Sequence, residues 1–202
     1  MRKNIIKIGI TGGIGTGKST VCLIFRQLGT PIYDADQRAK WLMTNNKLLK
    51  EEIIEHFGNE SYLPNGELNR GYLANQVFQD QQKVALLNAL VHPKVGQDMK
   101  NWANQQKKNY VLKEAALMIE SGSYKELDKI ILVDAPLDIR LKRIQKRDPQ
   151  RTEQEILGII AKQMPEEEKR KVADFIVLND QTQLLIPQVL NLHKQFLTLI
   201  NK

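Results

Sequence analysis

Residues 5–28 read IIKIGITGGIGTGKSTVCLIFRQL, which is a short apolar run, a glycine-rich segment and a run with apolar residues at helical spacing. The middle segment, from Gly12 to Ser19, fits G-x-x-x-x-G-K-[ST] between a predicted strand and a predicted helix. Glycines let a backbone wrap around a phosphate with its amides pointing inward, and the following helix presents its positive end. Lys18 adds a point charge, and Ser19 is placed to coordinate Mg²⁺. The segment therefore predicts a nucleoside triphosphate site; a glycine-rich turn without a ligand is the alternative.

Short apolar stretches rich in Ile and Val alternate with longer helical patterns along the rest of the chain. This alternation is typical of a parallel sheet covered by helices. Five stretches predict strands that are near-continuously apolar, as strands buried on both faces are: 5–10, 31–33, 110–113, 130–133 and 175–178. We therefore expect an α/β fold with a three-layer α/β/α core around a five-stranded parallel sheet.

The composition is that of a globular protein. With 202 residues, 42% of them hydrophobic and 26% charged, the chain has enough apolar material for a core, which excludes wholesale disorder. Its apolar runs fall far short of the roughly 20 residues that a membrane helix needs. Cys22 is the only cysteine, which excludes an intramolecular disulfide and a zinc cluster and favours a cytoplasmic location. The net charge of +7 favours anionic partners.

Two segments are longer than simple crossovers require. About 75 residues separate the second and third predicted strands, whereas a βαβ connection needs roughly a dozen, so a helical region is inserted there. Between the fourth and fifth strands, Asp138 is expected to cap one helix, and Thr152 with Glu155 forms a capping box for the next. We expect a core of residues 1–35, 108–137 and 173–202, an insertion of residues 36–107 and a helical-hairpin lid of residues 138–172.

Among triphosphate-binding proteins, the sequence favours a small-molecule kinase. No Asp is followed by Gly three places on, and no N-K-x-D motif occurs, which argues against a GTPase switch. Asp34 and Asp36 follow the second strand at the edge where open α/β sheets bind ligands. A carboxylate there accepts the proton of an acceptor hydroxyl, while the alternative role is a helix cap. We favour Asp36 as the base.

Basic and polar residues further along the chain are weaker candidates. Arg140, Arg143 and Arg147 share one face of the predicted lid helix, where they either neutralise a transferring phosphate or form a solvated basic surface. His92-Pro93 is predicted at a helix break, either contacting substrate or serving structure. Glu114 either orients magnesium through water or pairs with a lysine.

The order of motifs along nearly the whole chain resembles the dephospho-coenzyme A kinase family. The phosphate loop, Thr11 to Thr20, is close to that family's T-G-G-I-G-S-G-K-S-T. The motifs that follow it are Asp34-Ala35-Asp36, Gly66-Glu67-Leu68-Asn69-Arg70 with Phe78, Leu87-Asn88-Ala89-Leu90-Val91-His92-Pro93, Glu120-Ser121-Gly122, Arg140 to Arg143, Arg147-Asp148, Gln163, Ala173-Asp174 and Asn179.

The resemblance implies ATP-dependent phosphorylation of the ribose 3′-hydroxyl of dephospho-coenzyme A, the final step of coenzyme A synthesis, with Mg²⁺ as the accompanying ion. It also implies a P-loop core, a coenzyme-binding helical region and a lid. We expect catalysis from Lys18, Asp36, Asp34 and Arg140. We expect ATP to contact Gly13, Ile14, Gly15, Thr16, Gly17, Lys18, Ser19, Thr20, Arg143, Arg147 and Asn179. We expect the coenzyme side to be formed by Asp36, Arg70, His92 and Pro93, and the metal to lie at Ser19.

The chain departs from the family pattern at three places. It has Ala116-Leu117-Met118-Ile119-Glu120 where P-L-L-F-E is frequent, Arg140 where many members have Gln, and Asp180 where Gly is frequent. Two other hypotheses remain: a kinase for another acceptor, and a nucleic-acid-binding ATPase. The second is disfavoured because no aromatic residues interleave with basic ones. We expect no nucleic-acid or membrane partner, and either a monomer or a weak homo-oligomer.

Overall fold

The structure is a computed structural model that describes residues 5–77 and 80–199. The chain forms two compact units: one contains the residues up to Asp34 and from Ala103 onward, and the other contains Ala35–Trp102. The predicted lid, residues 138–172, falls within the first unit. No helix in the described ranges is both long and apolar enough to cross a membrane.

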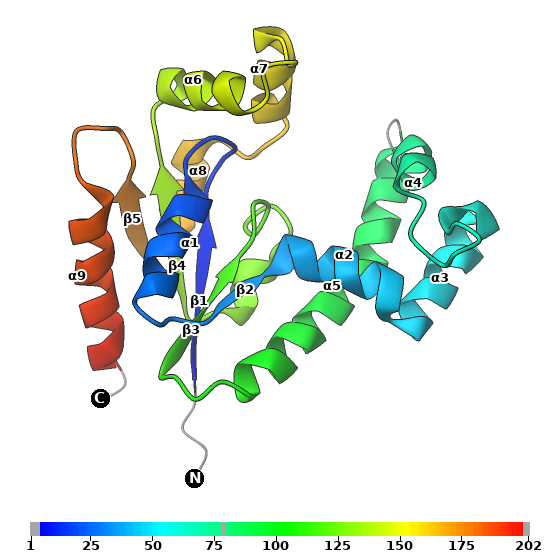
Figure 1. Ribbon diagram of the computed structural model, residues 1–202, viewed down its shortest axis with the longest axis horizontal. Coiled ribbons are helices and arrows are strands. Elements are labelled where there is room, and N and C mark those ends of the chain that lie inside the picture. Colours follow the sequence, from blue (N-terminus) through cyan, green and yellow to red (C-terminus); the bar gives the residue numbers. More distant parts are fainter. Residues whose placement is uncertain (1–4, 78–79, 200–202) are drawn as a thin grey trace. The chain divides into compact units, whose positions relative to one another are not determined.

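The first unit is built on a five-stranded sheet in the order β2-β3-β1-β4-β5, with every neighbouring pair parallel (Figure 1). This confirms the predicted α/β fold. Each predicted strand forms, with ends that differ by one residue or less from the prediction. The strands are β1 (Ile6–Thr11), β2 (Ile32–Asp34), β3 (Tyr110–Glu114), β4 (Lys129–Asp134) and β5 (Phe175–Leu178).

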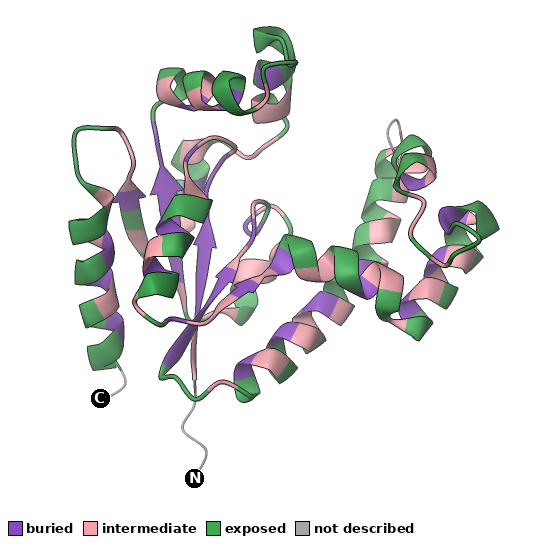
Figure 2. Cartoon of the chain, viewed as in Figure 1, coloured by how far each residue is buried: buried purple, intermediate pink, exposed green. Residues whose placement is uncertain are grey.

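Helices cover both faces of this sheet, which makes the three layers. The buried side chains of α1 (Lys18–Gln27) and α9 (Leu185–Thr198) join those of Ile131 and Val133 in one core. Because side chains alternate along a strand, Asp134 belongs to the opposite face, where Arg170 of α8 (Glu166–Val172) forms an ion pair with it. The central strands are accordingly buried along most of their length (Figure 2).

The lid segment contains one helix more than predicted. It consists of α6 (Leu137–Arg147), α7 (Glu153–Ala161) and the short α8. The capping box is confirmed, since Glu155 N donates to Thr152 Oγ1 at 3.2 Å and Thr152 N donates to the Glu155 carboxylate at 2.8 Å. The predicted Asp138 cap is wrong: α6 begins after Pro136, and Asp138 lies in its first turn, where a carboxylate still complements the helix dipole.

The second unit is helical, as predicted for the insertion. It contains α2 (Ala35–Asn45), α3 (Lys47–Phe57), the 3₁₀ turn η1 (Asn59–Ser61), α4 (Arg70–Val77) and most of α5 (Gln81–Asn104); a second 3₁₀ turn, η2 (Ser123–Glu126), lies in the first unit. The predicted break at His92-Pro93 is wrong, because α5 continues through Pro93. Val91, Val95 and Met99 are buried at four-residue intervals on either side of that proline, and this packing outweighs the lost backbone hydrogen bond.

Candidate active site

The phosphate loop, residues 12–19, follows the central strand of the sheet. β3 flanks β1 on one side and β4 on the other, so the loop lies at the carboxyl edge where the chain changes sides. Gly12 has a φ of +149°, and a Cβ there would lie 2.2 Å from the carbonyl oxygen of Val133. Only glycine therefore fits where the loop leaves the strand.

Side chains of the loop bind its own carbonyl groups. Lys18 Nζ donates to the carbonyl oxygen of Gly12 at 2.8 Å and lies 3.4 Å from that of Gly13. Thr16 Oγ1 donates to the Gly13 carbonyl at 2.9 Å. The ammonium group of Lys18 is thus held over the loop at the start of α1, whose first turn also carries the exposed Ser19 and Thr20.

Residues distant in sequence hold the remaining carbonyl groups. Arg140 Nε donates to the carbonyl of Ile14 at 2.9 Å, and Asn179 Nδ2 donates to that of Thr16 at 2.8 Å. Arg143 Nη2 in turn donates to both the backbone and side-chain oxygens of Asn179 at 3.0 Å. Because N–H and C=O point in opposite directions across a planar trans peptide, the amides of these units face the inside of the loop. The result is a backbone concavity suited to an anion.

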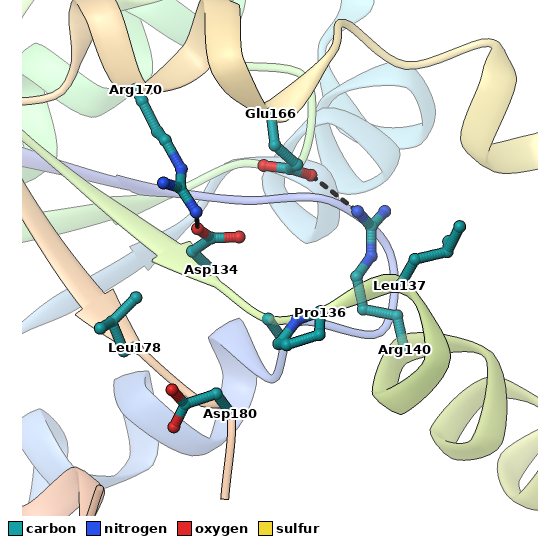
Figure 3. Close-up of a pocket in the computed structure, with 9 residues that line it drawn as sticks. Asp134, Pro136, Leu137, Arg140, Glu166, Arg170, Leu178 and Asp180 are labelled. Atoms are coloured by element: carbon teal, nitrogen blue, oxygen red, sulfur yellow. Dashed lines mark hydrogen bonds and ion pairs between the residues drawn. The ribbon is translucent and has the colours of Figure 1, made fainter. Parts of the chain in front are cut away.

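A cavity of about 330 Å³ lies beside the loop, at the carboxyl ends of β4 and β5 (Figure 3). It is lined by two ion pairs, Arg140 with Glu166 at 3.0 Å and Arg170 with Asp134. Asp180 also lines it, and hydrogen bonds from Thr182 hold the pKa of that carboxyl below its usual value.

Arg140 faces the loop rather than solvent. Its exposed fraction is 4%, while Arg147, on the same helix, is exposed and hydrogen-bonded to Asp148. That hydrogen bond, with the charge of Arg147, lowers the pKa of Asp148. The three arginines therefore do not act as one surface: two hold the loop and one lies at the end of α6.

A second layer of charges stands behind Arg140, and sequence reasoning missed most of it. Lys169 is completely buried, with Nζ 3.4 Å from the Glu120 carboxylate and 3.8 Å from that of Glu166. Gln163 Oε1 accepts a hydrogen bond from Ile14 N at 2.9 Å. The sequence did contain a signal for helix α8, namely three consecutive Glu residues after Pro165, because acidic residues favour the first turn of a helix.

Side chains with oxygen atoms that can bind a metal lie where β2 and β3 end. Asp34 and Glu114 are paired in the strand register, and Ser19 Oγ donates to Glu114 Oε1 at 3.3 Å. Burial and the nearby carboxylate of Glu114 raise the pKa of the Cys22 thiol, so this cysteine stays protonated. In the described ranges, no three His, Cys, Asp or Glu side chains converge as a metal cluster. The hydroxyl and carboxylate oxygens present do fit Mg²⁺, which prefers oxygen ligands and retains waters.

The other predicted substrate residues belong to the helical unit. Asp36 lies in the first turn of α2 and is exposed, and Arg70 is the first residue of α4. His92 and Pro93 are consecutive exposed residues of α5. Their predicted roles in binding the coenzyme stay predictions.

Comparison with known proteins identifies the family. A family model described as dephospho-CoA kinase matches residues 6–184. The chain belongs to the dephospho-CoA kinase family. A dephospho-CoA kinase from Bacteroides fragilis is 37% identical over 188 residues, which cover 93% of this chain and 91% of that protein. One from Coxiella burnetii is 36% identical, with 96% and 98% covered. The chain is therefore a kinase, that is, a phosphotransferase.

Solved structures agree with the dephospho-CoA kinase family. A Thermus thermophilus protein of known crystal structure has a TM-score of 0.80 at 34% identity, with 97% of this chain and 98% of that one covered. Dephospho-CoA kinase from Campylobacter jejuni has a TM-score of 0.69 at 28% identity, with 94% and 96% covered. Shikimate kinase from Acinetobacter baumannii, at 16% identity and a TM-score of 0.55, shares the fold alone.

Proposed function

We propose that the protein transfers the γ-phosphoryl group of ATP to the ribose 3′-hydroxyl of dephospho-coenzyme A, giving coenzyme A and ADP. The observation that carries this proposal is the family match over residues 6–184. The fold itself does not select the acceptor, because shikimate kinase shares it. The phosphate loop, whose Ile14 and Thr16 carbonyl groups are bound by Arg140 and Asn179, supplies the triphosphate half of the proposal.

Two kinds of side chain carry out the phosphoryl transfer: a cation and a general base. Lys18 neutralises charge on the transferring phosphoryl group, in a site where positioning and electrostatics supply most of the catalysis. Asp36 accepts the proton of the attacking 3′-hydroxyl, and Asp34 at the end of β2 is the alternative base. The proton leaves the hydroxyl as its oxygen forms the new bond to phosphorus, and the leaving group is ADP.

Other side chains hold the nucleotide. Ser19 and Glu114 offer the oxygens through which this chain would hold Mg²⁺, whose charge offsets that of the β- and γ-phosphates. Arg143 and Asn179 fix the loop around the triphosphate. We assign Arg147, at the end of α6, to the nucleotide in line with the family pattern. We assign Arg70, His92 and Pro93 to the coenzyme side, in line with the family pattern. Small-molecule partners and a cytoplasmic location complete the proposal.

The test is an acceptor panel with purified protein, ATP and Mg²⁺. ADP release is measured with dephospho-coenzyme A, adenosine, a nucleoside monophosphate or no acceptor, and the product is mapped by phosphorus NMR. We expect turnover with dephospho-coenzyme A alone and phosphate at the ribose 3′ position. Lys18→Ala is the matched control, because it removes charge from the loop without opening the core. Its turnover should fall by several orders of magnitude.

Other outcomes would redirect the assignment. Turnover with a different acceptor would mean that the helical unit serves another metabolite. Acceptor-independent ADP release, together with oligonucleotide binding that weakens steeply with salt, would favour the nucleic-acid ATPase. Unchanged turnover in Lys18→Ala would remove the loop from the mechanism.

A further inference from the structure

The guanidinium group of Arg140 makes two hydrogen bonds, one to the phosphate loop and one to α8. Nε donates to the carbonyl of Ile14 at 2.9 Å, and Nη1 donates to Glu166 Oε1 at 3.0 Å. Nη2 is buried and makes no hydrogen bond to any described residue. Arg140 thus joins the phosphate loop to the first turn of α8, and Glu166 fixes the direction in which the guanidinium points (Figure 3).

The ion pair packs directly on the loop. A Cβ at Gly13 would lie 2.3 Å from Arg140 Nη2 and 2.4 Å from Glu166 Oε1. The absence of a side chain at Gly13 therefore brings both charged groups against its backbone. A shift of either group changes the space available to the Gly13–Ile14 peptide.

Glu166 is held in turn by buried charge. Lys169, completely buried, lies 3.8 Å from Glu166 and 3.4 Å from Glu120, whose Oε1 also accepts a hydrogen bond from Met164 N at 3.1 Å. Two cations and two anions balance within this cluster. Glu166 therefore has its position fixed from α8 and from the segment after β3, independently of any nucleotide.

We propose that Glu166 is a positioning residue for phosphoryl transfer, which acts through Arg140 to hold the Gly13–Ile14 segment of the phosphate loop in its anion-binding shape. Lys169 supports it by fixing its carboxylate. Neither residue touches substrate in this proposal. It rests on the proposed function, because a triphosphate must occupy the loop for the positioning to matter.

The Arg140–Glu166 contact also prevents a competing one. Without the Glu166 carboxylate, two buried cations would face one anion, and the triphosphate would become the strongest partner for Arg140. Arg140 would then leave the Ile14 carbonyl for a phosphate oxygen. ATP would still bind, but the loop would no longer hold the γ-phosphate in line, so turnover would suffer more than affinity.

The first test compares Glu166→Gln with Glu168→Gln. Glu168 lies on the same helix in an exposed pair with Lys171, so its loss removes a carboxylate of α8 away from the loop. For Glu166→Gln we expect kcat to fall at least tenfold, with no rise in the KM of ATP or dephospho-coenzyme A. Glu168→Gln should match the wild type. Equal loss in the two variants, or a tenfold rise in the KM of ATP with kcat intact, would overturn the proposal.

A double variant covers the case in which Glu166→Gln does not fold. Arg140→Gln/Glu166→Gln removes the charge pair together and leaves Lys169 balanced by Glu120. If Glu166 acts through Arg140, the kcat of the double variant equals that of Arg140→Gln within about twofold. A further tenfold loss would show that Glu166 acts by another route.

Hydrogen exchange separates this proposal from the proposed function, since it requires no turnover. Amides of residues 12–20 should exchange at least tenfold faster in Glu166→Gln, which keeps Arg140, than in Glu168→Gln, in the absence of nucleotide. Unchanged exchange there would refute positioning even if the wild type is an active kinase. If exchange is faster but the wild type does not act on dephospho-coenzyme A, the positioning role of Glu166 stands. Only the proposed substrate is then wrong.

Discussion

Asp34 and Asp36, two residues apart in the chain, lie on different elements. Asp34 ends β2, where it is paired in register with Glu114, whereas Asp36 lies in the first turn of α2. A residue that ends a strand is fixed by the sheet, and it suits holding a hydroxyl or a metal-bound water. Asp36 is the second residue of α2 and is exposed, where an acceptor hydroxyl can approach it.

We predict that Asp36→Asn lowers kcat at least a hundredfold with little change in nucleotide affinity. The amide keeps the shape of the side chain but does not accept the hydroxyl proton. Steady-state kinetics and titration with a fluorescent ATP analogue measure the two quantities. Asp34→Asn, the matched variant, should lose less of kcat, and the reverse order of effects would make Asp34 the base.

Among individual residues, those predicted from spacing alone belong to one contiguous motif. The glycines, Lys18 and Ser19 lie within one short segment, so their spacing alone predicted a loop. Glu166 and Lys169 escaped because their importance depends on Arg140, more than 20 residues away, and on Glu120 further still. Buried charge pairs of this kind have no periodicity that would reveal them.

At the scale of elements, the loop is shaped by parts of the chain that flank it from both sides. β4 passes so close to Gly12 that its backbone excludes a side chain there, while α6 and α8 bring charges against Gly13. The strand contact involves a carbonyl oxygen fixed in the sheet, and it cannot move aside. The geometry of the loop is therefore a property of the assembled core.

We predict that Gly12→Ala destabilises the protein by about 3 kcal/mol or more, because the new Cβ meets a backbone atom and the residue keeps a positive φ. Urea denaturation followed by circular dichroism measures the change. The matched control is Gly158→Ala in the middle of α7, where nothing lies within 4 Å of the added Cβ. That variant should gain up to about 1 kcal/mol. Equal stability of the two variants would contradict the packing argument.

Element boundaries were predicted well where one pattern dominates and poorly where tertiary contacts decide. The strands lie on short, mostly apolar runs rich in Ile and Val, which were sufficient to predict them. Helix α5 runs through Pro93 because residues on both sides are buried on one stripe, which outweighs the local rule that proline ends a helix. Helix α8, only seven residues long, is too short for periodicity to show and is fixed by its charges.

At the scale of the first unit, a hydrogen-bonded chain ties three distant segments together. Tyr110 at the start of β3 contacts Thr30 Oγ1 at 2.9 Å and His193 Nδ1 of α9 at 2.5 Å. Burial raises the pKa of Tyr110 to about 12, and burial with the charge of Lys108 lowers the pKa of His193 below 6.5. Both groups are therefore held neutral in the folded protein.

We predict that stability falls on both sides of neutral pH. Below about pH 6.5 the unfolded chain protonates His193 first, and between pH 10 and 12 it loses the Tyr110 proton first, so acid and alkali both favour unfolding. Urea denaturation between pH 5 and 12 measures this. Tyr110→Phe should reduce the alkaline loss by about 2 kcal/mol, and His193→Gln should flatten the acid side. An unchanged alkaline slope in Tyr110→Phe would contradict this account.

The strand order determines when, during synthesis of the chain, β1 can pair with its neighbouring strands. β1 lies in the middle of the sheet, yet its partners are Leu112 opposite Ile8 and Ile131 opposite Ile10, more than a hundred residues later in the chain. At roughly 5 to 20 residues per second, the ribosome needs on the order of 5 to 20 seconds to supply them. During that interval β1 has no neighbouring strand to pair with. Pairing of β1 therefore has to wait until the chain has been synthesised at least as far as β3 and β4.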